Sequence, residues 1–378
     1  MRILTINAGS TSVKIERFDL DGALPPLVDA PPLAADRRTP GPDADAAIAR
    51  AARGVDVVAH RFVRLPDPDA AVVPIDAKLR TALAGVESDA PLHDAPALAA
   101  ADVVAGAAPG VLQLAVSDSA FHRTMPEPAR TYAIPRELTR RGLRRLGFHG
   151  LSHQYAAHRA CALARADVRR ARVVTAHLGG GSSLCAIARG ASVDTTMGYT
   201  PLEGLPMATR SGSVDPGLLL HLLRGGMTVD ELDATLERRS GLLGVSGRSG
   251  DLRTLLRERD PDARLAVDVL CWRLRAAVGA MIGVLGDVDM LVFTGGIGEN
   301  VPRVREAGAN GAWAAGARID PARNGGIARE GCVSRAASPV GVYVVAAREN
   351  WQLARMAYAH VEPAFATPSS AADGASVG

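Results

Sequence analysis

Lysine is almost absent from the sequence, although arginine is abundant. Lys14 and Lys78 are the only lysines among 378 residues. The formal net charge is only +3, which is too small to indicate a nucleic acid or a membrane surface as a partner. Lys14 lies in a Gly/Ser segment, and because lysine is so rare here, this position is more informative than any single arginine.

Cysteine is also scarce, and no two cysteines have the spacing of a metal or redox motif. The four cysteines are widely separated and form no Cys-x-x-Cys pair. Cys185 and Cys271 lie in apolar runs, where a thiol is typically buried and free. We therefore expect neither a disulfide framework nor a zinc site built on cysteine.

Long apolar runs are missing as well. The most apolar long stretch, residues 266–285, is interrupted by Asp268, Arg273 and Arg275, so we expect no membrane span. The sequence begins directly on a predicted strand with no signal peptide, which indicates a cytoplasmic protein. An apolar fraction of 47% over 378 residues predicts a folded globular chain of two domains or one large domain.

The common phosphate-binding motifs are absent, but two other Gly/Ser segments are present. No GxxxxGK[ST] and no GxGxxG after a strand occurs. Instead, residues 6–18 (INAGSTSVKIERF) and 176–188 (AHLGGGSSLCAIA) share a strand–turn–strand layout. Glycines let a backbone approach a ligand closely, and successive N–H groups can bind an anion. We predict two phosphate-binding hairpins in a duplicated, two-lobed fold; ordinary glycine turns are the alternative.

Single polar residues near these segments are candidate site groups. Arg210 lies in a Gly/Ser loop, where its planar fork could bind phosphate or carboxylate. Asp118 follows an apolar strand, a frequent position for a catalytic acid, although it could instead cap a helix. His149 and His153 could bind zinc if a helix held both, but Gly150 argues against a helix there. We interpret His149 as a site donor and His153 as structural.

Several elements are predicted from their residue patterns. We expect an irregular surface segment with a short helix at 21–54 and a loop at 242–253 in which Asp251 caps a helix. The continuous apolar stripe of residues 261–285 predicts a long helix that forms core or a dimer face. A Gly-rich turn at 295–300, between a strand and a helix, suits a nucleotide.

Ten motifs then match one family. They are INAGSTSVK, APLHD, SDSAFHRTMP, GFHGLSH, HLGGGSS, SVDTTMGYTPLEG, MATRSG, SGLLGVSG, GDLR and FTGGIGEN, in this order. The sequence resembles the acetate kinases of the acetokinase family from residue 1 to about 358. The resemblance implies an α/β, duplicated two-domain actin-like ATPase (ribonuclease H-like) fold with a cleft between domains. It places residues 1–119 and 349–365 in domain I, 120–348 in a nucleotide-binding, dimerising domain II, and 366–378 in a flexible tail.

The resemblance also implies an activity. It indicates reversible, Mg²⁺-dependent transfer of the ATP γ-phosphoryl group to acetate, which gives acetyl phosphate and ADP, with Mn²⁺ as a possible substitute metal. It further implies a homodimer. The alternatives are a propionate or other short-chain acyl kinase of the same family, and a catalytically weak nucleotide-binding sensor.

Site residues follow from the positions at which the motifs match. The implied catalytic set is Arg61, Asp118, His149 and Arg210. The implied acyl-binding set is Arg61, Val63, Leu92, His93, Phe148 and Pro201. The implied nucleotide-binding set is Ser10, Ser12, Lys14, His177, Leu178, Gly179, Gly180, Gly181, Asp251, Leu252, Arg253, Gly296, Ile297, Gly298, Glu299 and Asn300. The implied magnesium ligands are Asn7 and Glu349.

Three departures from the family pattern motivate the sensor alternative. Gly180 stands where the family has asparagine, Arg64 lies where the family has histidine and glycines after its HR-V motif, and Arg348 interrupts the family's TNEE. Because a carboxylate substrate is already a nucleophile, the reaction needs charge stabilisation rather than a strong base. We therefore expect Asp118 to orient an arginine or position magnesium rather than to accept a proton.

Overall fold

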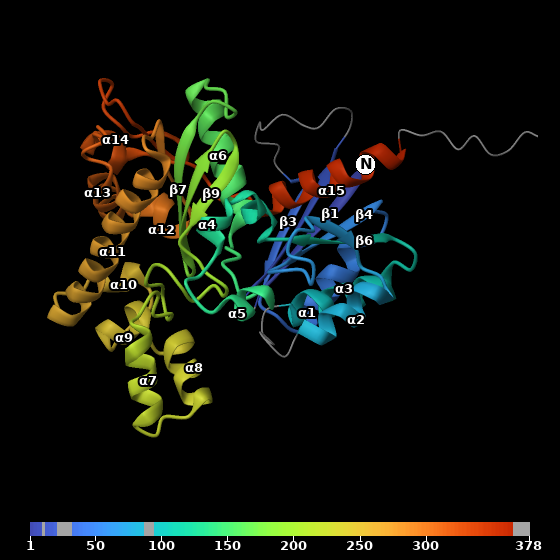
Figure 1. The fold of residues 1–378 in the computed structure, drawn as a ribbon. Helices are drawn as coiled ribbons and strands as arrows, with labels where there is room; N and C mark the ends of the chain where they lie inside the picture. The colour runs from blue at the N-terminus through green and yellow to red at the C-terminus, as the bar shows by residue number, and fades with distance from the viewer. Residues whose placement is uncertain (10–11, 21–31, 87–93, 366–378) are drawn as a thin grey trace, which may run out of the picture. The chain divides into compact units, whose positions relative to one another are not determined.

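The protein consists of two compact units. The computed structural model describes residues 1–9, 12–20, 32–86 and 94–365. Unit 1 comprises Met1–Asp118 and Glu349–Gly378, and unit 2 comprises Ser119–Arg348. Figure 1 shows the helices and strands of both units.

A six-stranded mixed sheet forms the centre of unit 1, in the order β3-β2-β1-β4-β6-β5. Its strands are β1 (Arg2–Ala8), β2 (Val13–Asp19), β3 (Ala34–Arg38), β4 (Val57–Phe62), β5 (Val72–Pro74) and β6 (Leu112–Ser117). The parallel strands β1, β4 and β6 lie side by side. Their carboxyl ends therefore meet at one edge of the sheet, the usual place for a site in this class of fold.

Helices cover both faces of this sheet. They are α1 (Pro42–Ala51), α2 (Ala77–Val86), α3 (Ala95–Ala107) and α15 (Glu349–Phe365). Leu4, Ile6 and Ala8 of β1 form a core with α1 and α3. On the opposite face, Trp351 of α15 contacts Phe18, with ring centroids 5.2 Å apart. Because side chains alternate along a strand, Asn7 lies on the α15 face.

Unit 2 is built on a second mixed sheet of six strands, in the order β11-β12-β10-β7-β8-β9. Its strands are β7 (Arg172–Leu178), β8 (Ser182–Ala188), β9 (Ala191–Thr195), β10 (Met290–Thr294), β11 (Gly331–Cys332) and β12 (Gly341–Val344). Read from β9, this order repeats that of unit 1 from β3, with the same parallel and antiparallel pairs. The predicted duplicated α/β fold is confirmed.

The helices of unit 2 mostly pack on the two faces of its sheet, whereas those at Pro216–Arg224 and Val229–Arg238 pack against each other instead. The helices of this unit are η1 (Ala120–Thr124), α4 (Glu127–Arg130), α5 (Arg136–Arg140), α6 (Gly150–Ala164), α7 (Pro216–Arg224), α8 (Val229–Arg238), α9 (Gly241–Ser246), α10 (Leu252–Leu255), α11 (Pro261–Leu285), α12 (Gly295–Asn300), α13 (Pro302–Gly311) and α14 (Pro321–Gly326). Val174, Ala176 and Leu178 of β7 form a core with α11 and α13. Helix α6 packs on the other face of β7.

Three local expectations were wrong. The predicted turn at 295–300 is helix α12, and the predicted loop at 242–253 contains helix α9. The segment expected to be irregular contains β3, which pairs with β2. In each case tertiary packing overrides a local Gly-rich or polar composition.

Other expectations are confirmed. Helix α11 spans Pro261–Leu285 as predicted, and Asp251 caps α10 by accepting a bond from the Arg253 N–H. The cysteines are free thiols, with Cys185 buried and Cys271 partly buried. None of the helices in the described part of the chain is both long and apolar enough to cross a membrane.

Candidate functional site

The first group of predicted site residues lies at the carboxyl edge of the unit 1 sheet. Arg61 is near the end of β4, and Asp118 directly follows β6, where its N–H donates to the carbonyl of Phe62. The Arg61 guanidinium donates from Nη2 to Asp118 Oδ2 at 2.6 Å. Asp118 is fully buried, and an unpaired carboxylate in such a position would be very costly. The pairing of β4 with β6 thus places Arg61 and Asp118 close enough to form a short ion pair.

Arg61 keeps one donor unused within this arrangement. Its Nη1 donates to Asn7 Oδ1 at 3.4 Å, but its buried Nε has no hydrogen-bond partner among the described residues. The neighbouring carboxylates of Asp118 and Glu349 raise the pKa of the guanidinium against the opposing effect of burial. The Arg61 side chain is 18% exposed, and a guanidinium held in position by a carboxylate is suited to bind an anion.

A second cluster joins the first hairpin to the start of α15. Asn7 and Lys14 lie directly opposite each other on β1 and β2. Asn7 Nδ2 and Lys14 Nζ both donate to Glu349 Oε2, each at 3.1 Å. The residues predicted as magnesium ligands, Asn7 and Glu349, are therefore in contact, and Lys14 neutralises the carboxylate.

The acyl-binding set is only partly within the described residues. Val63 is half-buried, and its N–H donates to Asp94 Oδ1 at 2.7 Å. In unit 2, Phe148 and Pro201 are buried. Three predicted ligands lie outside the described residues: Ser10, Leu92 and His93.

The second hairpin forms a tight glycine turn in unit 2. Between β7 and β8, the Gly179 N–H donates to the Gly181 carbonyl at 2.9 Å. A side chain at Gly181 would lie 3.1 Å from the His149 ring and 3.7 Å from Arg210 Nη1. At Gly180, by contrast, no atom lies within 4 Å of the position of a Cβ. The structure therefore brings His149 and Arg210 to the same glycine turn.

His149 has an unusual backbone and a specific partner. Its φ of 58° is left-handed, an uncommon state for a residue other than glycine. It precedes α6 and places Nδ1 2.9 Å from Ser183 Oγ. The His149 and His177 ring centroids are 4.4 Å apart, and His177 Nδ1 lies 2.7 Å from Ser152 Oγ. Held strain of this kind is frequent at functional sites.

Both ring nitrogens of His153 lie within hydrogen-bond distance of hydroxyl groups, so neither is placed as a metal ligand. Its two ring nitrogens lie 2.7 Å from Thr175 Oγ1 and 2.8 Å from Ser183 Oγ. Burial lowers its pKa well below the ordinary value. No cluster of three or more histidine, cysteine or acidic residues suited to a metal occurs in the described ranges. The zinc alternative therefore has no support, and His153 is buried as expected.

Arg210 is oriented by an acidic residue of α8. Its Nε donates to Glu237 Oε2 at 2.9 Å, and Nη2 donates to no acceptor within the described part of the chain. The loop that carries Arg210 is joined to the glycine turn, because the Ala208 N–H donates to the Gly180 carbonyl at 3.4 Å. This ion pair leaves the far edge of the guanidinium available for a ligand.

The remaining nucleotide-binding predictions divide into ligand-accessible and packed residues. Asp251 and Arg253 are exposed and pair with each other at 2.8 Å. Leu178 and Leu252 are buried in the core, and Gly298 is buried in α12. The Ser12 carbonyl accepts from the Gly9 N–H, and Asn300 Nδ2 donates to the Gly296 carbonyl within α12. Glu299 Oε1 accepts from the N–H of Ala347, which lies between β12 and α15. Ile297 packs partly against the core.

Helix α12 is held against the glycine turn by a residue that sequence reasoning missed. Arg305 is buried and donates to the carbonyls of Gly298 and Glu299 at 2.9 and 2.8 Å. It also bonds to Asn324 Oδ1 at 2.6 Å. At the other end of α12, a Cβ on Gly295 would lie 2.6 Å from the Leu178 carbonyl. A lone arginine after the GGIGEN motif gives no local signal of this role.

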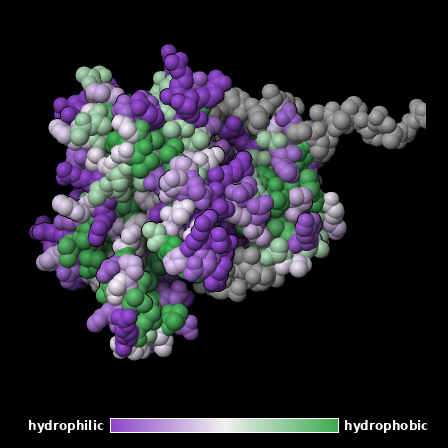
Figure 2. All heavy atoms as spheres, viewed as in Figure 1, coloured by the Kyte–Doolittle hydropathy of each residue, from purple (hydrophilic) through white to green (hydrophobic). Residues whose placement is uncertain are grey.

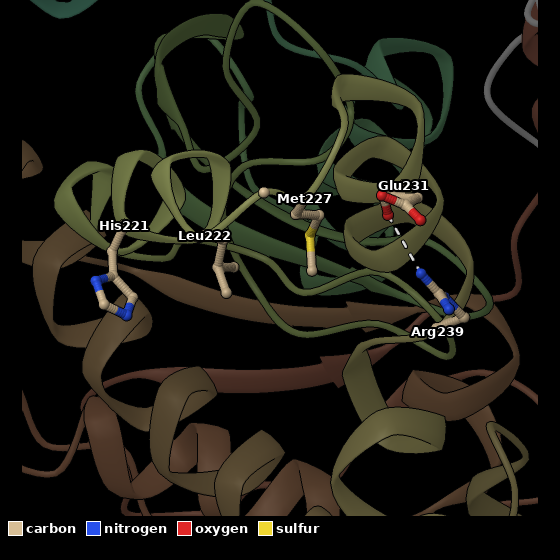
Figure 3. Close-up of a pocket in the computed structure, with 7 residues that line it drawn as sticks. His221, Leu222, Met227, Glu231 and Arg239 are labelled. Atoms are coloured by element: carbon tan, nitrogen blue, oxygen red, sulfur yellow. Dashed lines mark hydrogen bonds between the residues drawn. The ribbon is translucent and has the colours of Figure 1, made fainter.

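One open hollow of unit 2 contains none of the predicted site residues. It has a volume of about 510 Å³ and lies between α7 and α8, where Leu222 and Met227 are among its lining residues. Figure 3 shows these side chains together with the bond from Arg239 to Glu231, which is 3.2 Å long. The predicted chemistry is not in this hollow.

Comparison with known proteins assigns the sequence to a family. The model of the acetokinase family matches residues 44–355. An acetate kinase of Thermosynechococcus vestitus is 43% identical over 304 residues, which cover 80% of this chain and 73% of that protein.

Two solved structures are similar over nearly the whole chain. The acetate kinase of Porphyromonas gingivalis has a TM-score of 0.83 and 31% identity, covering 93% of this chain and 98% of its own. A propionate kinase from Francisella tularensis subsp. tularensis has a TM-score of 0.82 and 28% identity, covering 94% and 98%. These likenesses agree with the duplicated fold.

Proposed function

The chain belongs to the acetokinase family, and from this we infer that it is an acetate kinase. It transfers the γ-phosphoryl group of ATP reversibly to acetate, giving acetyl phosphate and ADP. The observation that carries the site assignment is the partly exposed Arg61, whose guanidinium is oriented by the fully buried Asp118. Such a group binds a small carboxylate or phosphoryl anion.

The reaction requires charge stabilisation at both reacting anions. A carboxylate oxygen of acetate forms a bond to the γ-phosphorus while the bond from that phosphorus to the ADP oxygen breaks, and no proton is transferred. Positioned cations offset the repulsion between the two anions and the charge on the equatorial phosphoryl oxygens. We assign this work to Arg61 and Arg210, each held by a carboxylate.

The glycine turn and His149 form the phosphoryl side of the proposed site. Gly179, Gly180 and Gly181 present backbone to the nucleotide phosphates, and His149 donates to the transferring group. The absence of side-chain atoms near Gly180 supports close approach of a ligand. Asp118 acts by orienting Arg61, since its oxygen at 2.6 Å is already engaged by Nη2.

The proposed metal is Mg²⁺, which enters with the nucleotide; Mn²⁺ is an acceptable substitute. Asn7 and Glu349 would offer the ion an amide and a carboxylate oxygen, the ligand types that Mg²⁺ prefers, in place of their present bonds from Arg61, Asn7 and Lys14. Two oxygen ligands fit an ion that is otherwise held by substrate phosphates and water. The bound ion would neutralise phosphate charge. Lys14 now pairs with Glu349 at 3.1 Å and is well placed to contact the same phosphates.

A series of acids of increasing chain length tests which acid is the substrate. We propose that Val63, Phe148 and Pro201 limit the acyl group to acetate. Purified protein is incubated with MgATP, hydroxylamine and acetate, propionate or butyrate, and acyl hydroxamate is measured. We expect product to decrease with chain length, since one methylene is worth about 1–3 kcal/mol.

One variant sharpens this test. Val63→Ala should raise the propionate-to-acetate ratio of kcat/KM, whereas an unchanged ratio would reject the role of Val63. If propionate is the best substrate of the wild-type protein, the family assignment stands and the acid is corrected. ATP binding without product from any acid would favour the sensor alternative.

We also propose that the protein assembles as a homodimer through α11. Leu265 and Trp272 lie seven residues apart on one face of this helix, and both are more than half exposed. Gly279 and Gly283 continue the same face and are open to solvent. Figure 2 shows hydrophobic surface over α11 and α7. Small and aromatic residues on one helical face permit close packing of a second copy.

Sedimentation velocity measures this assembly. The wild-type protein should sediment as a dimer, and Trp272→Glu should shift it to a monomer. Trp313→Glu is the matched control, because Trp313 is another exposed tryptophan that stacks on Arg318 instead. A monomeric wild type, or equal effects of both variants, would contradict the proposed interface.

A further inference from the structure

A continuous chain of hydrogen bonds runs from the interior of unit 2 to His149. It begins at the Cys185 carbonyl, 3.5 Å from Thr175 Oγ1, and Thr175 Oγ1 lies 2.7 Å from His153 Nδ1. His153 Nε2 lies 2.8 Å from Ser183 Oγ, which lies 2.9 Å from His149 Nδ1. Thr175, His153 and Ser183 are all fully buried. No member of this chain is a predicted ligand except His149.

The positions of the protons along this chain depend on one another, because each group can donate or accept only certain hydrogen bonds. His153 is neutral, because burial and the surrounding histidines lower its pKa well below the ordinary value, so it carries one ring proton. The Ser183 hydroxyl has one hydrogen and can donate to only one of its two histidines. When His149 is neutral, the two histidines must therefore both be protonated on Nδ1 or both on Nε2, which gives the chain one of two senses.

The contact at the far end of the chain indicates that sense. The Cys185 carbonyl can only accept, and when the Thr175 hydroxyl donates to it across 3.5 Å, His153 donates from Nδ1 to Thr175. His153 Nε2 then accepts from Ser183, and the Ser183 oxygen accepts from His149 Nδ1–H. This is also the only sense that accommodates a cationic His149, which donates from both nitrogens.

We propose that Thr175, His153 and Ser183 are positioning residues that keep a proton on Nδ1 of His149. The proton that His149 exchanges or donates is then the one on Nε2. That edge of the ring faces the glycine turn, since a Cβ on Gly181 would lie 3.1 Å from Nε2. The inference rests on the proposed role of His149 at the phosphoryl group, and it explains why a serine and a buried histidine support that ring.

The surrounding backbone fixes the ring in the same place. His149 is held at a φ of 58°, and Gly147 before it has a φ of 77° with no room for a Cβ. A Cβ on Gly147 would lie 2.6–2.7 Å from side-chain atoms of Thr195 and His122. Backbone and relay together orient one ring nitrogen, as is typical of supports for a functional histidine.

Nitrogen NMR of histidine-labelled protein without substrates tests the relay directly. Long-range ¹H–¹⁵N correlation distinguishes the two neutral tautomers, and the His149→Gln variant assigns the His149 signals. At a pH where His149 is neutral, we expect both His149 and His153 to be protonated on Nδ1. A wild-type His149 protonated on Nε2 would overturn the proposal.

Thr175→Val is the decisive variant, because Thr175 does not touch His149. Without an acceptor for Nδ1–H, His153 should change to the Nε2–H tautomer and donate to Ser183. Ser183 would then donate to His149 Nδ1, and His149 should change to Nε2–H. An unchanged His149 tautomer in a folded Thr175→Val protein would contradict the relay.

Kinetics and a matched control complete the test. Ser183→Ala should lower kcat about 10-fold or more with little change in the KM for ATP, and Ser183→Thr should restore most of the loss. Ser192→Ala removes a bond of the same kind, because Ser192 Oγ lies 2.9 Å from Nδ1 of buried His122. It should leave the His149 tautomer unchanged. A wild type that makes no acetyl phosphate but has the expected tautomers would reject the proposed function, not the relay.

Discussion

At the scale of single residues, the Arg61–Asp118 pair is the most constrained feature of the proposed site. Asp118 is fully buried, and the 2.6 Å bond from Arg61 compensates its charge. The same bond fixes the guanidinium plane, and the Arg61 side chain remains 18% exposed to a ligand. The two residues therefore act together: the carboxylate orients the arginine, and the arginine binds the substrate.

Asp118→Asn tests this division of work. The amide keeps the shape and one acceptor but loses the charge, so Arg61 is less firmly oriented and kcat should decrease about 10²-fold. Steady-state kinetics with circular dichroism as a fold check measure the effect. The control is Asp102→Asn, which removes an exposed carboxylate 2.7 Å from Arg80. Unchanged turnover in Asp118→Asn would reject the orienting role.

Gly180→Asn tests the departure at the glycine turn. Space for a side chain exists there, because nothing lies within 4 Å of a Cβ at this position. We expect no loss in melting temperature and a several-fold decrease in the KM for ATP, since the amide adds a hydrogen-bond donor beside the phosphates. Gly181→Asn is the contrasting variant and should lower activity, because His149 lies 3.1 Å from its Cβ. An increased KM for ATP in Gly180→Asn would contradict this account.

At the scale of elements, α12 depends on a side chain outside it. Arg305 of α13 donates to two carbonyls near the end of α12 and to Asn324 of α14. Each buried carbonyl left unsatisfied would cost about 1–3 kcal/mol. The position of α12 beside the glycine turn is thus set by α13 and α14.

Arg305→Lys should raise the KM for ATP at least several-fold and leave the KM for acetate nearly unchanged. A lysine cannot reproduce the planar set of bonds that Arg305 makes. Arg303→Lys, on the same helix, is the control, because Arg303 makes an exposed ion pair with Asp268. Equal changes in both KM values would indicate general unfolding rather than a local effect at α12.

The sequence predicts elements best where their ends carry strong local signals. Helix α11 begins after Asp260, whose side chain accepts from two N–H groups, and ends at the left-handed Gly286. Helix α12 has no such signal, because Gly295 and Gly296 indicate a turn. Its helical state comes from packing on β7 and from Arg305, which local sequence does not encode.

At the scale of the whole molecule, the repeated hairpins predicted the duplication that the two sheets confirm. Which side chains contact one another was harder to predict from the sequence. The resemblance assigned Asn7 and Glu349 to magnesium, but the bond of Lys14 to Glu349 joins residues 335 positions apart. Likewise, the Ser183 and Glu237 partners of His149 and Arg210 follow only from three-dimensional packing.

A buried histidine predicts how stability changes with pH. His60 is fully buried, and burial lowers its pKa to about 4, against the opposing effect of its bond to Gln113. The unfolded chain, with an ordinary pKa of 6.5, therefore binds the proton first as pH falls. Stability should decrease between pH 6.5 and 4, by up to about 3 kcal/mol from this group.

Urea unfolding at several pH values checks this expectation. His60→Gln should make the free energy of unfolding less dependent on pH in that window, whatever its effect at pH 7. His221→Gln, at an exposed position of α7, should leave the dependence unchanged. An identical pH dependence in His60→Gln and the wild type would contradict the assignment to His60.

The most direct measurement is ³¹P NMR of the purified protein with MgATP and acetate, in the wild type and in Arg61→Ala. In an acetate kinase, the ATP γ-phosphate signal should decrease while acetyl phosphate and ADP appear in equal amounts. The rate should be about 10²–10³-fold lower in Arg61→Ala. ATP that remains intact, or that yields only inorganic phosphate without acetyl phosphate, would show that the protein is not an acetate kinase.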